Sequence, residues 1–192
     1  MGLSAYMRPM ENMKLRRKDL VPPSMSITKF WAVIICASET NTVTKTHEQD
    51  DAVLLDSSYL GWLGPAYTAL THGEGTSPLW DFSYSQVTIA IRSIAELFNI
   101  SDLVAYQLRH SGPSVDRAMN LRSIEDVKKR GRWASHQAVR RYEKAGRLSQ
   151  TELSYSPEFR AYAAICEKQL EGVVLGHISH PSDASLRVVK KR

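Results

Sequence analysis

Residues 106–112 read YQLRHSG and residues 130–144 read RGRWASHQAVRRYEK. The prediction of the fold begins from the reactive side chains in these two stretches. They place the pair Arg109 and His110, then Trp133 and Tyr142, in and around a strongly basic segment. A tyrosine that lies among cations can lose its phenolic proton and act as a nucleophile. Arginines suit an anionic target because the planar guanidinium matches two oxygens of a phosphate. The pattern therefore predicts a nucleophile directed at a phosphate.

The basic charge of the chain is concentrated around this segment. The whole chain has 25 Lys and Arg against 20 Asp and Glu, whereas residues 121–148 alone hold nine basic and three acidic residues. A charge run is usually a solvated face, but this one also contains the tryptophan and the tyrosine, which favours a phosphate-binding surface. The predicted contacts to a DNA backbone are Arg16, Arg17, Lys128, Lys129, Arg130, Arg132, Arg140 and Arg141.

Length and composition are those of one globular domain. The chain has 192 residues, of which 43% are hydrophobic and 23% charged. Its two cysteines predict small core residues in a reducing compartment, and its histidines show no metal-ligand spacing. The longest apolar run, residues 31–37, is too short to span a bilayer. We expect an intracellular protein without a membrane anchor, with a folded domain over residues 1–176 and a flexible basic tail over residues 177–192.

The hydrophobic patterning predicts a mainly α-helical protein with a small antiparallel β-sheet. Residues 30–37 are rich in β-branched and aromatic side chains, and residues 52–55 can pair back on them as a second strand. Capping residues indicate where the expected helices begin, and glycine or proline residues indicate where they end. These helices cover residues 1–15 with a break at Pro9, then 59–70, 84–98, 101–109, 114–120, 124–130, 135–146 and a last one beginning at Ser156 and Pro157. The Gly112–Pro113 pair is expected to break the chain between two of them.

The chemistry that these residues can support is metal-free. A phosphodiester resists nucleophiles, so cleavage needs cations on its oxygens, an activated nucleophile and an acid for the leaving oxygen. The sequence has no H-E-x-x-H, no C-x-x-C and no glycine-rich P-loop. We therefore expect covalent catalysis by arginines and a tyrosine, with no cofactor and no metal.

On these motifs the chain resembles the catalytic domain of the tyrosine recombinases, or phage-type integrases, including those of eukaryotic mobile elements. Residues 2–20, GLSAYMRPMENMKLRRKDL, resemble the first box of the family, in which an arginine (Arg8) stands three residues before a glutamate (Glu11) and an aspartate (Asp19) closes the box. Lys45 stands just before the second predicted strand, where the family has its catalytic lysine.

The second and third boxes extend the resemblance. The family's His-x-x-Arg-His reads YQLRH here, so Arg109 and His110 match and Tyr106 replaces the first histidine. The family's Gly-x-His/Trp segment precedes the nucleophilic tyrosine, which follows its His or Trp by nine residues. Trp133 and Tyr142 have that separation. The match covers most of the chain, from its first residues to about residue 148.

The resemblance implies a role for each matched residue. Arg8 and Arg109 would grip the scissile phosphate, and Trp133 would pack beneath it and offer its indole N–H. Lys45 would protonate the leaving 5′ oxygen, and Tyr142 would attack and form a 3′-phosphotyrosyl link. Three further residues would support the site: Glu11 as the partner of Arg8, His110 to orient the box or contact the phosphate, and Tyr106, a poor proton shuttle near pH 7, as a hydrogen-bond donor.

The resemblance also implies the partners and the place of action. We expect binding to double-stranded DNA, self-association on it as a tetramer, and location in the nucleus if the host is eukaryotic and otherwise in the cytoplasm. Because the chain begins almost inside the first box, the family's N-terminal DNA-clamping domain is expected to be absent. Two alternatives stay open: a truncated mobile-element fragment that binds DNA without cleaving it, and an enzyme similar to type IB topoisomerases.

Overall fold

Three short strands form an antiparallel sheet in the order β1–β2–β3 in the computed structural model, which describes residues 1–35, 51–100, 103–143 and 145–179. The strands are β1 (Leu20–Val21), β2 (Ala32–Ile35) and β3 (Asp51–Leu54), and Val33 of β2 pairs with Val53 of β3. The predicted pairing of residues 52–55 with the preceding apolar strand is confirmed. The strand β1 was not expected, because two residues before Pro22 are too few to show an alternating pattern.

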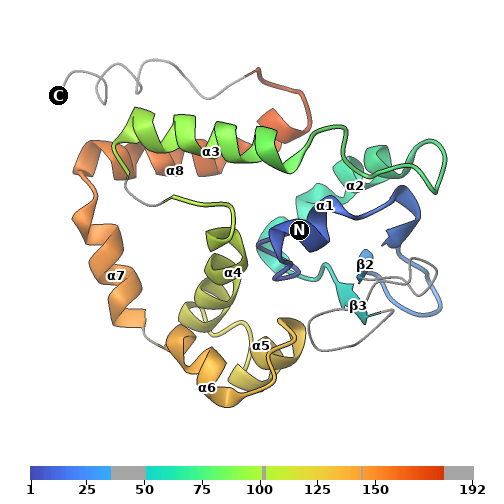
Figure 1. Ribbon diagram of the computed structural model, residues 1–192, viewed down its shortest axis with the longest axis horizontal. Helices are drawn as coiled ribbons and strands as arrows, with labels where there is room; N and C mark the ends of the chain where they lie inside the picture. The colour runs from blue at the N-terminus through green and yellow to red at the C-terminus, as the bar shows by residue number, and fades with distance from the viewer. Residues whose placement is uncertain (36–50, 101–102, 144, 180–192) are drawn as a thin grey trace.

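A first hydrophobic core lies around this sheet. Figure 1 shows α1 (Pro9–Met13) and α2 (Gly64–Thr71) on one side of the strands. Two 3-10 helices, η1 (Arg17–Asp19) and η3 (Ser58–Leu63), directly precede β1 and α2 in the chain. The expected break at Pro9 is confirmed, because Pro9 lacks an N–H and stands at the start of α1, but the helical conformation expected for the rest of residues 1–15 is wrong outside α1. The buried residues of this core are Ala5, Met7, Leu15, Leu20, Val33, Ile35, Val53, Tyr67 and Leu79.

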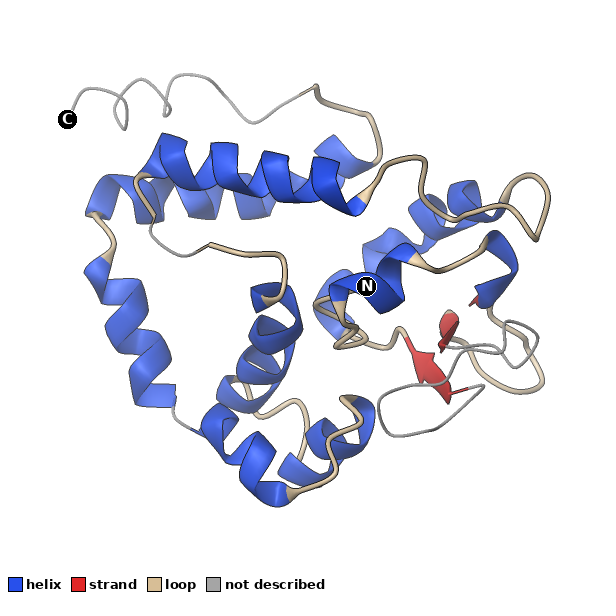
Figure 2. Cartoon of the chain, viewed as in Figure 1, coloured by secondary structure: helices blue, strands red, loops and turns tan. Residues whose placement is uncertain are grey.

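The rest of the described chain is helical (Figures 1 and 2). Its elements are α3 (Tyr84–Phe98), α4 (Gln107–Ala118), α5 (Ile124–Arg130), α6 (His136–Val139), the 3-10 helix η4 (Arg140–Glu143), α7 (Ala145–Ser154) and α8 (Pro157–Val174). Figure 1 shows α3 and α8 side by side, and the Phe98 ring lies 5.2 Å from that of Phe159. Among the described residues, no helix is both long and apolar enough to cross a membrane.

Helix α4 runs through Gly112 and Pro113, so the predicted break at this pair is wrong. Pro113 lacks the N–H that would bond to the carbonyl of Arg109, which ordinarily disrupts a helix. Tertiary packing compensates at this place. A Cβ on Gly112 would lie 2.0 Å from the carbonyl oxygen of Leu3 and 2.8 Å from the Tyr6 ring, so the N-terminal segment packs directly on the helix.

The segment that carries Tyr142 also differs from expectation. Ser135 caps α6 as predicted, but the helix ends at Val139 and Tyr142 lies in the 3-10 turn η4. Gly146 was expected to end this helix, whereas it lies inside α7. Four calls fall outside the described residues: the core cysteine at position 36, the lysine at position 45, the cap at position 101 and the tail from residue 180 onward.

Candidate active site

Helix α4 carries Arg109 into the interior, where the side chain is fully buried. Its Nη1 donates to the carbonyl oxygen of Tyr6, and its Nη2 donates to that of Gly131 at 2.6 Å. The guanidinium also lies over the Trp133 ring, 4.8 Å from its centroid. Burial, and then the charges of Arg8 and Arg132, lower the pKa of Arg109 to about 10. The group stays cationic at neutral pH and joins the N-terminal segment to the turn after α5.

Arg8 precedes α1 and is held by Glu11. The backbone N–H of Arg8 donates to Glu11 Oε2 at 2.8 Å, and its guanidinium pairs with the other carboxylate oxygen. The same carboxylate accepts from Arg132 Nη2 at 2.7 Å. Burial opposes the ionisation of Glu11, but the Arg132 charge and the hydrogen bonds from Arg8 outweigh it and hold the pKa of Glu11 below its usual value. One carboxylate therefore positions two arginines.

A tight turn after α5 brings Trp133 against Arg109. Gly131 ends the helix as predicted, and a Cβ at this position would lie 1.8 Å from the Trp133 ring, so only glycine fits. Arg132 follows in the left-handed region, with φ of 55°. The turn therefore places the Gly131 carbonyl, the Arg132 side chain and the Trp133 ring beside Arg109.

The Tyr142 hydroxyl lies 2.5 Å from His110 Nδ1, and its ring lies 5.2 Å from that of Trp133. Tyr142 is only 3% exposed. Burial raises the pKa of Tyr142 to about 12, although the charges of Arg141 and Arg109 act to lower it. Burial, with the same two cations, lowers the pKa of His110. A neutral imidazole is therefore in place to accept the tyrosine proton.

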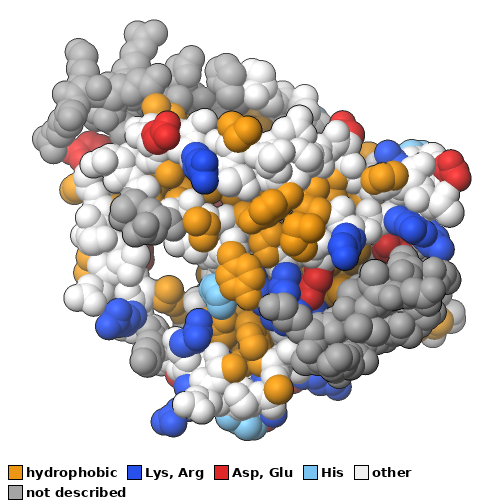
Figure 3. Space-filling view, viewed as in Figure 1, with side chains coloured by type: hydrophobic (Ala, Val, Ile, Leu, Met, Phe, Trp, Pro, Cys, Tyr) orange, Lys and Arg blue, Asp and Glu red, His pale blue; other side chains and the backbone are white. Residues whose placement is uncertain are grey.

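The structure thus brings six of the predicted residues together from distant parts of the chain. They are Arg8, Glu11, Arg109, His110, Trp133 and Tyr142. Tyr106 lies at the edge of the group, 42% exposed, with its ring 5.0 Å from that of His110. Figure 3 shows hydrophobic side chains gathered in the middle of this face of the molecule, beside basic, acidic and histidine side chains. Lys45 is outside the described residues.

The basic residues predicted to contact DNA separate into two groups. Lys129, Arg140 and Arg141 are exposed, and Arg16, Arg17 and Lys128 are half-buried. Arg17 also donates to the Leu70 carbonyl at 2.6 Å, and the remaining two, Arg130 and Arg132, have interior partners. Arg130 donates to the Ser4 carbonyl at 2.8 Å and pairs with Asp56 at 3.0 Å, and the Arg132 side chain is 2% exposed. The open basic surface is therefore smaller than the sequence suggests.

Sequence reasoning missed the buried network behind the site. Asp116 on α4, which is 1% exposed, accepts from the Tyr6 hydroxyl and from Arg122 Nε at 2.9 Å. Arg122 also pairs with Asp56 at 2.5 Å. A signal for Asp116 is present in the spacing, because Arg109, Gly112 and Asp116 recur on one face of a continuous helix. Because a break was expected at Gly112 and Pro113, Arg109 and Asp116 were assigned to separate helices and their common face was not recognised.

Within the described part of the chain, no three His, Cys, Asp or Glu residues lie close enough to hold a metal ion. Comparison with models of protein families, with curated protein sequences and with solved structures finds no match to this chain. The geometry of the site is therefore the basis for a proposal about function.

Proposed function

We propose that the chain is the catalytic domain of a tyrosine recombinase, which cleaves and rejoins double-stranded DNA through a covalent link to Tyr142. One observation carries the proposal: the Tyr142 hydroxyl lies 2.5 Å from His110 Nδ1, next to the buried Arg109. A tyrosine, an adjacent base and a set of arginines are the groups that covalent phosphoryl transfer requires. Arg8, from the N-terminal segment, adds a second arginine beside Arg109.

The chemistry follows from these positions. The Tyr142 oxygen attacks phosphorus as its proton passes to His110 Nδ1, and the bond from phosphorus to the 5′ oxygen breaks. Arg8 and Arg109 neutralise the charge that develops on the non-bridging oxygens. The leaving 5′ oxygen takes a proton, for which Lys45 is the proposed donor. Rejoining is the reverse reaction, in which a 5′ hydroxyl attacks the phosphotyrosine, so no high-energy cofactor is needed.

Tyr142 is buried, so its hydroxyl must become exposed before it can reach a phosphate. At 3% exposure the side chain offers almost no surface to a DNA strand. It lies in the short turn η4 between α6 and α7, so a movement of this turn exposes the hydroxyl without unfolding a long helix. Burial raises the pKa of Tyr142 and keeps the phenol protonated until then, with His110 already in place to take up the proton. DNA binding and activation of the nucleophile are coupled in this scheme.

The test is covalent capture of DNA. We expect the protein to form an adduct with a nicked duplex substrate whose short cleaved strand diffuses away. The adduct should vanish in Tyr142→Phe and persist in Tyr84→Phe, a matched change at a 40% exposed tyrosine at the start of α3. An adduct that survives in Tyr142→Phe rules out this nucleophile. A wild-type protein that shifts DNA on a gel but forms no adduct leaves DNA binding alone as its activity.

A further inference from the structure

Three arginines, Arg8, Arg109 and Arg132, meet in the interior beside the candidate nucleophile. Arg109 is fully buried and the side chain of Arg132 is 2% exposed, whereas Arg8 is 19% exposed and forms the open side of the group. Glu11 pairs with Arg8 and Arg132, and Asp51 lies 3.5 Å from Arg132 Nη1. Three cations thus face two carboxylates. A buried cation without a full set of partners is costly, so the cluster has a positive charge to neutralise.

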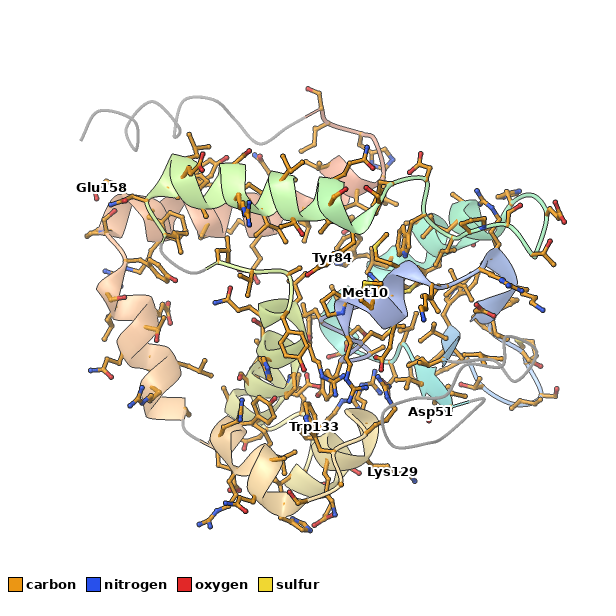
Figure 4. The ribbon with its side chains drawn as sticks, in the orientation of Figure 1. Met10, Asp51, Tyr84, Lys129, Trp133 and Glu158 are labelled. Atoms are coloured by element: carbon orange, nitrogen blue, oxygen red, sulfur yellow. The ribbon has the colours of Figure 1, made fainter. Side chains whose placement is uncertain are left out.

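The cluster also contains unused hydrogen-bond donors. Among the described residues, Arg109 Nε and Arg132 Nε are buried and have no hydrogen-bond partner, and Arg132 Nη1 makes no hydrogen bond beyond its 3.5 Å ion-pair contact with Asp51. Buried N–H groups nearly always have an acceptor, and an unsatisfied one costs the desolvation of that group. Figure 4 shows side-chain nitrogens gathered between Trp133 and Asp51, the region to which these groups belong. The arginine cluster thus combines N–H groups that lack an acceptor with a net positive charge, which indicates a binding site for an oxyanion.

The backbone of Arg132 gives an independent reason to assign it a role. Its φ of 55° is a left-handed conformation that a long side chain adopts at a cost and that glycine adopts without one. Such strain persists where surrounding contacts hold it, and it concentrates at binding and catalytic sites. Here the strained turn directs a guanidinium inward to Glu11, next to the Gly131 carbonyl that holds Arg109. A glycine would make the same turn but would contribute no cation.

We propose that Arg132 is a third arginine ligand of a tetrahedral oxyanion bound between Arg8 and Arg109. The identity of the natural anion, a backbone phosphate of DNA, rests on the proposed function, whereas the anion site itself does not. With three guanidinium groups, the site can contact all the non-bridging oxygens of one phosphate. Arg132 therefore belongs to the phosphate site and not to the exposed basic surface that contacts the neighbouring backbone.

The first experiment measures binding of inorganic phosphate to the whole chain by calorimetry, with Trp133 fluorescence as a second readout. Sodium chloride at matched ionic strength is the control for screening. We expect saturable binding to the wild type and about tenfold weaker binding to Arg132→Lys, which keeps the charge but loses the planar fork. Arg132→Gly keeps the turn and should weaken binding further. Arg92→Lys, an exposed arginine on α3, should bind as the wild type does.

The outcomes separate this inference from the proposed function. If Arg132→Lys binds phosphate as tightly as the wild type, or if the wild type shows no binding beyond that of chloride, the third-ligand assignment is wrong even where the DNA adduct forms. If phosphate binding depends on Arg132 but no DNA adduct forms, the anion site stands and the recombinase proposal fails. If a nicked DNA duplex displaces inorganic phosphate from the protein, the natural anion is a phosphate of DNA. Failure of displacement assigns the site to free phosphate compounds.

Discussion

Removal of the Tyr6 hydroxyl tests the buried network that supports the site. In Tyr6→Phe the ring keeps its place beside Trp133, and the backbone carbonyl still accepts from Arg109. Only the hydrogen bond from the hydroxyl to Asp116 is lost, and Asp116 keeps its 2.9 Å contact with Arg122. A hydrogen bond to a charged group contributes about 1.5–3 kcal/mol to stability. Because the substitution creates almost no cavity, we expect the free energy of unfolding to fall by about that amount.

The assay is urea unfolding followed by circular dichroism, with the midpoint and slope fitted separately. Tyr84→Phe, at an exposed tyrosine, should stay within about 0.5 kcal/mol of the wild type. The slope should not change in either variant, since both keep the fold. If Tyr6→Phe also stays within about 0.5 kcal/mol, Asp116 does not depend on the tyrosine and the network has been misassigned. The double variant Tyr6→Phe with Asp116→Asn, compared with the two single variants, measures the coupling energy of the two residues.

Other predictions follow from single features of the structure. Gly131→Ala should destabilise the chain by about 1–3 kcal/mol and change the near-ultraviolet signal of Trp133, because the new methyl group would overlap the indole. Gly146→Ala should be neutral or stabilising in thermal unfolding, since this glycine is exposed, lies inside α7 and would meet nothing within 4 Å; a loss of about 1 kcal/mol would mean that the helix ends there after all. The pKa of Tyr142 is raised, so the unfolded chain releases this proton near pH 10 and the folded chain near pH 12. Stability should therefore fall across that interval, and by less in Tyr142→Phe. The pKa of His110 is lowered, so the rate of DNA adduct formation should be level near pH 7 and fall in acid as the imidazole takes up a proton. His110→Ala should lower that rate by about 10²- to 10⁴-fold, and an unchanged rate would exclude His110 as the base.

Helix starts were predictable because a cap is a local interaction. Ser83, Ser123, Ser135 and Ser156 each accept a hydrogen bond from the backbone N–H three residues later, as the sequence indicated. The side chain and the N–H that it satisfies are neighbours in the chain, so their meeting depends little on the rest of the fold. The antiparallel pairing of β2 and β3 was predictable for a similar reason, since both strands are short apolar runs close in sequence.

Helix ends and burial were less predictable because distant contacts decide them. Pro113 was expected to break a helix, but the packing of Leu3 and Tyr6 on Gly112 holds α4 together. Arg130 was assigned to an open basic surface from its neighbours in sequence. Its partners are Ser4, Leu54 and Asp56, which lie far away in the chain. A charge pattern shows which residues are cations but not which carboxylates or carbonyls will reach them.

The same division holds for the candidate site. The residue types that suggest phosphoryl transfer, Arg109, His110, Trp133 and Tyr142, are visible in two short stretches of sequence, because side-chain chemistry belongs to each residue. Tertiary structure alone decides that His110 meets the Tyr142 hydroxyl and that Glu11 joins Arg132 to Arg8. Burial and neighbouring charge set the pKa values and leave arginine donors unused, and both arise only when segments far apart in the chain pack together.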